Sequence, residues 1–271
     1  MPFNPGFKKG DIVSNELLRT TFGCSSQGGM RRSLVNKTLV IVSDHTRGVY
    51  EDRWIGDVLH YTGEGLKGDQ SLANRQNKTL MESNSNGVEV FLFEVFESTM
   101  YVFQGAVQQV EEPYQEVQPD SEGNDRKVWV FRLKLKDGSS PAVIDAKAWT
   151  YNQTKKQKSI SRLSDAEVKK RAGNAKRQVG TRDVSTTQFE RDGFVSEWAK
   201  RRAKGICDLC EKPAPFTKTN GEPYLEVHHV VWLSKGGADT IQNTVALCPN
   251  CHRKMHILND AKDRKTLVDG Y

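Results

Sequence analysis

Long apolar runs and abundant cysteine are both missing from this sequence. Among its 271 residues, no hydrophobic stretch approaches the roughly 18 residues that a transmembrane helix requires, so we expect no membrane partner. The first residues also lack a basic segment followed by an apolar one, which is the pattern of a signal peptide. Together these absences predict a cytoplasmic protein in a reducing compartment.

Positively charged residues are in modest excess. Lys and Arg number 40 against 34 Asp and Glu, which gives a net charge of +6. A basic chain favours a polyanion as partner, although the same charge could serve only solubility. The length is that of about two ordinary domains, and the 36% of hydrophobic residues is typical of a globular protein.

The first region, residues 1–148, is predicted to be rich in β-strands. Its apolar runs are short, some of them alternate with polar residues, and turn-forming stretches separate them. Few segments have the period of a helix. We therefore expect an antiparallel barrel or sandwich, with main strands near residues 38–42, 88–96, 101–103 and 128–135.

The next region, residues 149–185, is predicted to be a basic and partly helical linker. From Lys155 to Arg182 it holds ten Lys or Arg residues and only two acids. The run from Ser164 to Glu167 has the pattern of a capping box that opens a helix. Two interpretations stay open, a solvated connecting helix or a basic segment that lies along nucleic acid.

Four of the five cysteines form two CxxC pairs in the last region, residues 186–271. In a reducing compartment this arrangement favours a metal over disulfides. Four thiolates complete a tetrahedral zinc site and leave no open position, so we expect a structural Zn²⁺ ion. The 37 residues between the pairs exceed a simple zinc finger. The predicted zinc ligands are Cys207, Cys210, Cys248 and Cys251, whereas Cys24 is expected to be a small buried residue.

Most of the histidines lie between these pairs or directly after them. The order Leu225-Glu226-Val227-His228-His229, then Asn243, then Cys248-Pro249-Asn250-Cys251-His252 closely resembles the HNH nuclease family. The resemblance covers about residues 203–258. It implies a ββα-metal fold, in which two strands, a loop and a helix surround a divalent ion.

The resemblance assigns a role to each of these polar residues. His229 is the general base that takes a proton from the attacking water, as a neutral imidazole can near pH 7. His228 and His252 take the two positions that bind the catalytic ion, and Asn243 fixes the loop that aims the base. His256, one helical turn beyond His252, would support the helix face or touch the phosphate. The catalytic ion would be Mg²⁺ or Mn²⁺, although imidazole also accepts Ni²⁺ or Co²⁺.

A second resemblance lies in the first region. Tyr61-Thr62-Gly63-Glu64-Gly65 resembles the Tyr-Thr-Gly-x-Gly signature of the SRA (SET- and RING-associated) domains, which bind modified cytosine. Gly68-Asp69-Gln70 and Asn77-Lys78-Thr79-Leu80 resemble the motifs that follow it, and Gly48-Val49-Tyr50-Glu51-Asp52 resembles a strand of the other pocket wall. The resemblance covers about residues 8–140 and implies a twisted β-barrel that holds a flipped base.

Four residues of that pocket receive roles from the resemblance. Tyr50 and Tyr61 are the two rings that stack on the base, which offsets part of the cost of unstacking it. Asp52 reads the Watson–Crick edge by accepting from the exocyclic amine, and Thr62 contacts the base or its substituent.

The Gly-rich basic loop at residues 25–32 is a further expected DNA contact. Glycines permit a close backbone approach, and arginine suits bidentate contact with phosphate. The loop could enter a groove or fill the space that a flipped base leaves. Its predicted DNA-binding residues are Gln27, Arg31 and Arg32.

Together the two resemblances describe a modification-dependent, type IV-like restriction endonuclease of a prokaryote. It would flip and bind 5-methylcytosine or 5-hydroxymethylcytosine in double-stranded DNA and hydrolyse nearby phosphodiester bonds with a one-metal HNH site, in defence against phage. One HNH site cuts one strand, so we expect a homodimer.

Two alternatives stay open. The first is a non-catalytic reader of modified DNA with a structural zinc module. The second is an HNH nuclease whose first domain recognises a different modification or partner. In either case the expected fold class is α+β, with an SRA-like twisted β-barrel, a basic helical linker, and a ββα-metal domain that carries the zinc site.

Overall fold

The structure, a computed structural model, describes residues 2–46, 50–120, 122–173 and 179–269. The chain divides into two compact units, Met1–Thr186 and Thr187–Tyr271. The segment between the β-rich region and the cysteine-rich region therefore belongs to the first unit. In the described part of the chain, no helix is both long and apolar enough to cross a membrane.

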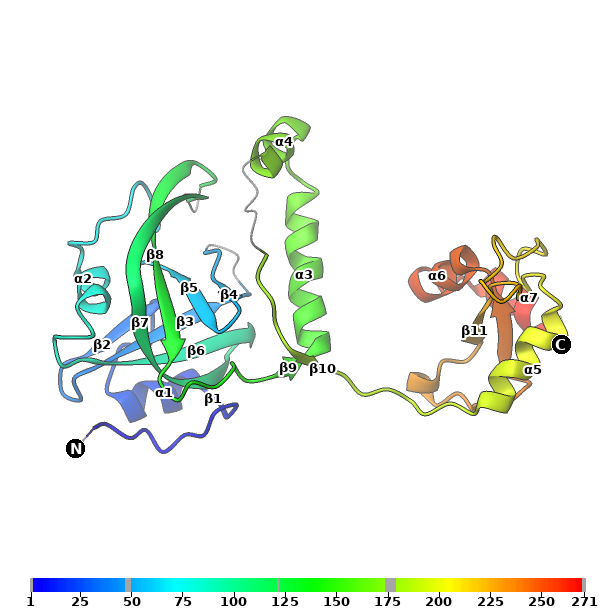
Figure 1. Ribbon diagram of the computed structural model, residues 1–271, viewed down its shortest axis with the longest axis horizontal. Helices are drawn as coiled ribbons and strands as arrows, with labels where there is room; N and C mark the ends of the chain where they lie inside the picture. Colours follow the sequence, from blue (N-terminus) through cyan, green and yellow to red (C-terminus); the bar gives the residue numbers. More distant parts are fainter. Residues whose placement is uncertain (1, 47–49, 121, 174–178, 270–271) are drawn as a thin grey trace. The chain divides into compact units, whose positions relative to one another are not determined.

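The first unit is built on one sheet of eight strands (Figure 1). The hydrogen-bonded path runs β2-β3-β6-β7-β8-β5-β4, and β1 pairs with β7 beside this path. Strands β3 and β6 are parallel, and the other neighbours are antiparallel. The strands are β1 (Ile12–Val13), β2 (Met30–Ser33), β3 (Thr38–Asp44), β4 (Arg53–Ile55), β5 (Val58–Thr62), β6 (Glu89–Glu97), β7 (Met100–Pro119) and β8 (Asp125–Leu135).

The α+β class with an SRA-like sheet is confirmed, although the sheet of the described residues does not close into a barrel. Among the described residues, β2 and β4 stand at the two ends of the path and do not pair with each other. These end strands have only four and three residues, so they offer few groups for closing bonds. Figure 1 shows the long β7–β8 hairpin curving along its length, and breaks of register at Gln109/Glu111 and Glu111/Tyr114 accompany that curvature.

Both faces of the sheet are buried, which explains the unbroken apolar run of β3. Leu39 and Ile41 pack into one core cluster, whereas Val40 and Val42 pack into another. This division follows from the two-residue period of a strand. Helix α1 (Asn15–Phe22) contributes to the second cluster and α2 (Arg75–Met81) to the first.

The basic segment is more helical than the sequence pattern indicates. Helix α3 (Ala146–Ile160) begins after Asp145, whose side chain accepts from the amide of Lys147 at 2.6 Å. Helix α4 (Asp165–Gly173) begins at the predicted capping box, where Ser164 Oγ accepts from the amide of Glu167 at 3.3 Å. Residues 174–178 of this segment lie outside the described residues.

The end of the basic segment is anchored in the first unit. Strand β10 (Val184–Ser185) pairs in parallel with β9 (Ile144–Asp145). The fully buried carboxylate of Glu94 lies 2.7 Å from Arg182 Nη1 and 3.1 Å from His45 Nε2. Burial alone would raise the pKa of Glu94, but the His45 hydrogen bond and the Arg182 charge lower it overall. Arg182 is therefore an interior ion-pair partner rather than part of a solvated basic surface.

The second unit places two short strands before a helix. Strands β11 (Glu226–His229) and β12 (Thr244–Leu247) pair antiparallel, with His229 opposite Thr244. Helix α6 (Pro249–Ile257) follows β12 directly, with Pro249 in its first turn, where the missing N–H has no helical partner to lose. The remaining elements are α5 (Gly193–Ala203), η1 (Leu233–Lys235) and α7 (Ala261–Asp269).

Candidate functional site

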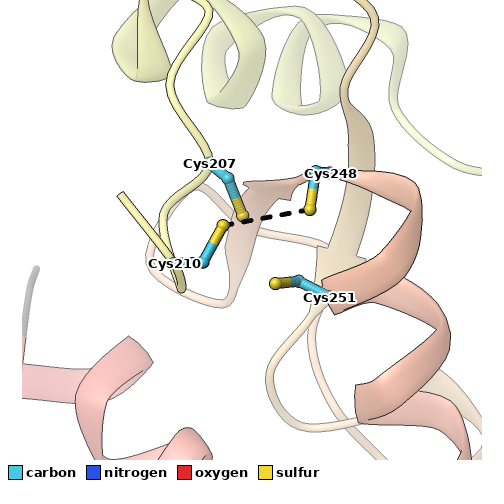
Figure 2. A group of neighbouring side chains, drawn as sticks. All are labelled: Cys207, Cys210, Cys248 and Cys251. Carbon is cyan, nitrogen blue, oxygen red and sulfur yellow. Dashed lines mark hydrogen bonds between the residues drawn. The ribbon is translucent and has the colours of Figure 1, made fainter. Parts of the chain in front are cut away.

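The four cysteines of the CxxC pairs meet in the second unit. Figure 2 shows their sulfur atoms turned toward one another, two from the segment after α5 and two from the start of α6. All four Sγ atoms lie within 4.8 Å of one another, and Sγ of Cys210 is 4.0 Å from Sγ of Cys248. A tetrahedral Zn²⁺ with Zn–S bonds of about 2.3 Å needs sulfur atoms about 3.8 Å apart.

The chemistry of this cluster also fits a cation. Burial, together with hydrogen bonds to Cys248 and Cys210, raises the pKa of the Cys251 thiol. Four thiolates can share so small a space only when a positive ion offsets their mutual repulsion. The cluster packs into the core of the second unit, so a Zn²⁺ ion held there would have a structural role.

Three histidines form a second cluster at the junction of β11 and α6. His228 comes from the strand, while His252 and His256 lie one turn apart on the helix. Their ligand nitrogens all lie within 4.8 Å of one another, and the Nε2 atoms of His252 and His256 are 3.2 Å apart. The buried Nε2 of His228 has no hydrogen-bond partner among the described residues. These convergent nitrogens fit a divalent ion.

The electrostatics of the cluster keep His228 in the form that binds metal. Burial, followed by the charges of His256 and His252, lowers the pKa of His228 to about 4. Burial likewise lowers the pKa of His256. Neutral imidazole offers a lone pair to a metal ion, and protonated imidazole does not.

Glu226 orients one of these ligands. Its Oε2 lies 2.5 Å from Nδ1 of His252, and its Oε1 accepts from the hydroxyl of Tyr224 at 3.1 Å. A carboxylate that holds one ring nitrogen fixes the tautomer, so Nε2 of His252 keeps its lone pair toward the cluster. The role of Glu226 could not be predicted from the sequence, because its spacing to His252 has no motif of its own.

We expect Glu226→Gln to weaken divalent-ion binding about 10–100-fold, the range seen when a carboxylate behind a metal-binding histidine is lost. Titration calorimetry with Mn²⁺ on the full chain would measure the affinity. Glu222→Gln is the matched control, because Glu222 is exposed and pairs with Lys218 across 2.9 Å. Equal Mn²⁺ affinities for the two variants would contradict a role for Glu226.

His229 lies beside the histidine cluster and has a partner of its own. Its Nε2 is 2.7 Å from Oδ1 of Asp239. A carboxylate can only accept, so in the neutral ring this contact places the proton on Nε2 and leaves Nδ1 as the basic nitrogen. Asp239 lies ten residues further along the chain, in the loop before β12, and no spacing rule pointed to it.

Asn243 closes the loop between the two strands. Its Nδ2 donates to the carbonyls of Val231 and Ala238, at 2.9 and 2.7 Å, and its Oδ1 accepts from the amide of Val231 at 2.8 Å. Gly237 belongs to the same closure, because an added Cβ would come within 1.9 Å of the Val231 carbonyl oxygen. The loop is thereby held against β11, which carries His229.

The histidines of the site line a cavity of about 320 Å³. The three cluster histidines and His229 line it, together with Trp232 and Arg191 among others. Arg191 precedes α5 and was not singled out from the sequence. A cavity with convergent imidazoles and a carboxylate-bound histidine is suited to proton transfer beside a divalent ion.

In the first unit the structure brings together most of the predicted base pocket. Oδ1 of Asp52 accepts from the amide of Thr62 at 2.8 Å, and Gln118 Nε2 reaches Thr62 Oγ1 at 3.0 Å. Burial raises the pKa of Asp52, although hydrogen bonds from Thr62 and Ser43 oppose this. Gln118, on β7, was not predicted as a neighbour of this pair.

The two predicted stacking tyrosines lie in different surroundings. Tyr61 is 3% exposed, belongs to the core cluster, and donates its hydroxyl to the Gly29 carbonyl at 2.9 Å. Tyr50 is partly buried, and its hydroxyl donates to the Gly65 carbonyl at 3.2 Å. The first residues of the other predicted wall, Gly48 and Val49, lie outside the described residues.

The predicted DNA contact through Arg31 requires a correction. Arg31 is 4% exposed, and its guanidinium donates to the Gly28 carbonyl at 2.9 Å and to Asn15 Oδ1 at 2.6 Å. Its groups are thereby committed to shaping the loop. Arg32 donates to the Thr38 carbonyl at 2.8 Å, whereas Gln27 is exposed.

Comparison with known proteins bears out both resemblances. Residues 9–156 match the family model of the ScoMcrA-like SRA domain, and residues 207–257 match that of the HNH endonuclease. The type IV methyl-directed restriction enzyme EcoKMcrA of Escherichia coli (strain K12) is 56% identical over 75 residues, which are 28% of this chain. The match spans 27% of that enzyme, so the chain covers about a quarter of the curated relative's length.

Solved structures show weaker likeness. The type IV phosphorothioation-dependent restriction endonuclease ScoMcrA is 19% identical with a TM-score of 0.40, over 97% of this chain and 62% of that one. The SUVH5 SRA domain in complex with fully methylated CG DNA is 28% identical with a TM-score of 0.39, over 51% of this chain and 94% of that one. Since the SRA model covers more than half of the residues, the chain belongs to the ScoMcrA-like SRA domain family, and it carries an HNH endonuclease domain in its second unit.

Proposed function

We propose that this protein is a modification-dependent restriction endonuclease. Its SRA unit would bind double-stranded DNA that carries 5-methylcytosine or 5-hydroxymethylcytosine, and its HNH unit would hydrolyse nearby phosphodiester bonds. The observation that carries the proposal is the pairing of His229 with Asp239 beside the cluster of His228, His252 and His256. The similar E. coli enzyme EcoKMcrA is a type IV methyl-directed restriction enzyme, which supports the same class.

His229 is the general base of the proposed reaction. Asp239 holds the Nε2–H of the ring, so Nδ1 accepts the proton of the attacking water. Asp239 also stabilises the imidazolium that then forms, as a carboxylate bonded to a catalytic histidine does. Asn243 holds the loop against β11 and so keeps Asp239 in reach of His229.

His228, His252 and His256 would hold the catalytic divalent ion. When bound, Mg²⁺ or Mn²⁺ would stabilise the charge that develops on the phosphate and the leaving oxygen, and three imidazoles could also accept Ni²⁺ or Co²⁺. The role of His256 as a third ligand goes beyond the sequence pattern, which suggested only the first two. Glu226 keeps His252 in the required orientation.

The modified base would be read beside Asp52 and Thr62. Asp52 directly precedes β4, and its carboxylate, which accepts from the amide of Thr62, would also accept from the exocyclic amine of a flipped cytosine. Tyr50, which is only partly buried, is the proposed stacking ring, and Tyr61 would close the pocket from the core side. Gln27 remains the exposed contact of the nearby loop.

A double-strand break needs two HNH sites, which is the reason to propose a homodimer.

Cleavage of matched plasmids that bear cytosine, 5-methylcytosine or 5-hydroxymethylcytosine, with Mg²⁺ or Mn²⁺ present, tests the proposal as a whole. Cutting only of the modified plasmids supports it. Equal cutting of all three favours an HNH nuclease whose SRA unit recognises another modification or partner. Binding of modified DNA without any cutting favours a non-catalytic reader.

We expect Asp52→Ala to reduce the preference for duplexes with 5-methylcytosine over duplexes with thymine at that position about 10-fold or more. Thymine lacks the exocyclic amine that Asp52 reads, and a good contact to a base edge contributes roughly 1–3 kcal/mol of discrimination. Fluorescence anisotropy with labelled duplexes would give both affinities. Asp57→Asn is the control, because Asp57 lies in the turn between β4 and β5 and pairs with Lys134 across 2.5 Å. An unchanged preference in folded Asp52→Ala protein would remove Asp52 from the pocket.

A further inference from the structure

A segment outside the HNH match contributes to the wall of the HNH cavity. The match begins at residue 207, whereas Phe189 and Arg191 precede helix α5. Both line the cavity that contains His228 and His229. The second unit therefore supplies to this cavity a stretch of chain that carries none of the motif residues.

Two hydrogen bonds hold this segment in place. The amide of Asp192 donates to Oδ2 of Asp239 at 2.6 Å, and the Asp192 side chain caps α5 by accepting from the amide of Phe194 at 2.7 Å. Oδ1 of the same Asp239 carboxylate lies 2.7 Å from His229. The backbone next to Arg191 is thus tied, through one carboxylate, to the proposed general base.

Arg191 brings a permanent positive charge to the cavity. It is exposed, and it forms no ion pair with any residue that the structure describes. The carboxylate of Asp239 lies nearby, but its two oxygens bond to the Asp192 amide and to His229 rather than to the guanidinium. The pKa of Asp239 is lowered by the His229 and Asp192 hydrogen bonds and also by the charge of Arg191, so that charge acts at this site.

A guanidinium that forms no ion pair, placed beside imidazoles, is suited to bind an anion. Its planar array of donors matches the non-bridging oxygens of a phosphate, and its charge stays fixed at any pH at which a nuclease works. The imidazoles would hold an ion or move a proton, but none of them provides a permanent charge for the phosphate itself.

We propose that Arg191 is a phosphate-binding residue of the HNH site, which contacts a non-bridging oxygen of the DNA strand at the cleavage position. This inference rests on the proposed nuclease function. Because charge builds up on the phosphate oxygens during the reaction, the contact strengthens in the transition state.

The test compares full-length Arg191→Ala and Arg191→Lys with wild type under single-turnover conditions on a modified duplex. We expect the alanine variant to cut about 10²–10³-fold more slowly, as when one donor to a developing oxyanion is removed, and lysine to restore part of the rate. Arg201→Ala is the matched control, because Arg201 lies on α5, is exposed, and pairs with Glu197 across 2.7 Å. Cutting by Arg191→Ala at the wild-type rate would overturn the inference.

A second measurement does not depend on cleavage. Without added Mg²⁺ or Mn²⁺, the dependence of DNA affinity on salt should become shallower in Arg191→Ala by about 0.9 in log–log slope, the value for one lost phosphate contact. An unchanged slope would overturn the contact. If wild type binds but never cuts, the nuclease proposal fails by itself, while the slope still decides whether Arg191 touches phosphate.

Discussion

Replacement of His229 by alanine is expected to slow DNA cleavage about 10²–10⁴-fold, which is the usual contribution of a positioned general base. The affinity for modified DNA should not change, because Asp52 and Thr62 belong to the other unit. The affinity for Mn²⁺ should also persist, since the three clustered histidines remain. Single-turnover cleavage, anisotropy and calorimetry on the same preparation would separate these three properties.

Asp239→Asn provides a companion to this experiment. The amide can present its NH₂ group to Nε2 of His229, which would favour the wrong tautomer and leave Nδ1 protonated. The loss should therefore appear in kcat more than in KM. If His229→Ala cleaves DNA at the wild-type rate, another group takes the proton. The roles assigned to His229 and Asp239 would then be wrong.

Loss of one zinc ligand, as in Cys251→Ser, is expected to unfold the second unit. Structural Zn²⁺ sites contribute an apparent binding free energy of about 10–16 kcal/mol at pH 7, and this energy stabilises the fold that forms the site. The cysteines join the segment after α5 to the start of α6. If these two segments separate, His252 on α6 would also lose its position. Thermal unfolding of the full chain, followed by circular dichroism, would then lack the unfolding transition of the second unit.

Cys24→Ser is the matched control for the zinc experiment. Cys24 is a buried free cysteine of the first unit, so its replacement should leave the zinc content and the transition of the second unit unchanged. Metal analysis should find one Zn²⁺ per chain in this control and less in Cys251→Ser. A folded second unit in zinc-free Cys251→Ser protein would contradict the structural role.

Local patterns were enough to predict a large part of the molecule. The two CxxC pairs predict that their four sulfur atoms lie close together, because four thiols with this spacing have few stable arrangements other than binding of one shared ion. The apolar run at residues 38–42 predicted β3, and the capping box at Ser164 predicted the start of α4. The order of the HNH residues also predicted that His228 and His252 lie on neighbouring elements, and they lie on β11 and α6.

Whether the sheet closes could not be predicted from such local patterns. Alternation of apolar residues reports which faces of a strand are buried, but it does not report whether the first and last strands meet. Among the described residues, β2 and β4 end the hydrogen-bonded path without pairing with each other. Burial of Arg182 against Glu94 depends on the same tertiary arrangement, because the two residues are 88 positions apart in the chain.

The amino-acid sequence by itself determined the two families, the strand-rich first unit, and the cysteines and histidines on which the proposed chemistry depends. The tertiary structure decided which partners these residues have. Asp239 reaches His229 only because the loop before β12 folds back, and Arg191 enters the cavity only because Asp192 bonds to that same carboxylate. Arg31 turns inward because its partners come from other elements. Such contacts depend on register and loop path, which no local sequence pattern encodes.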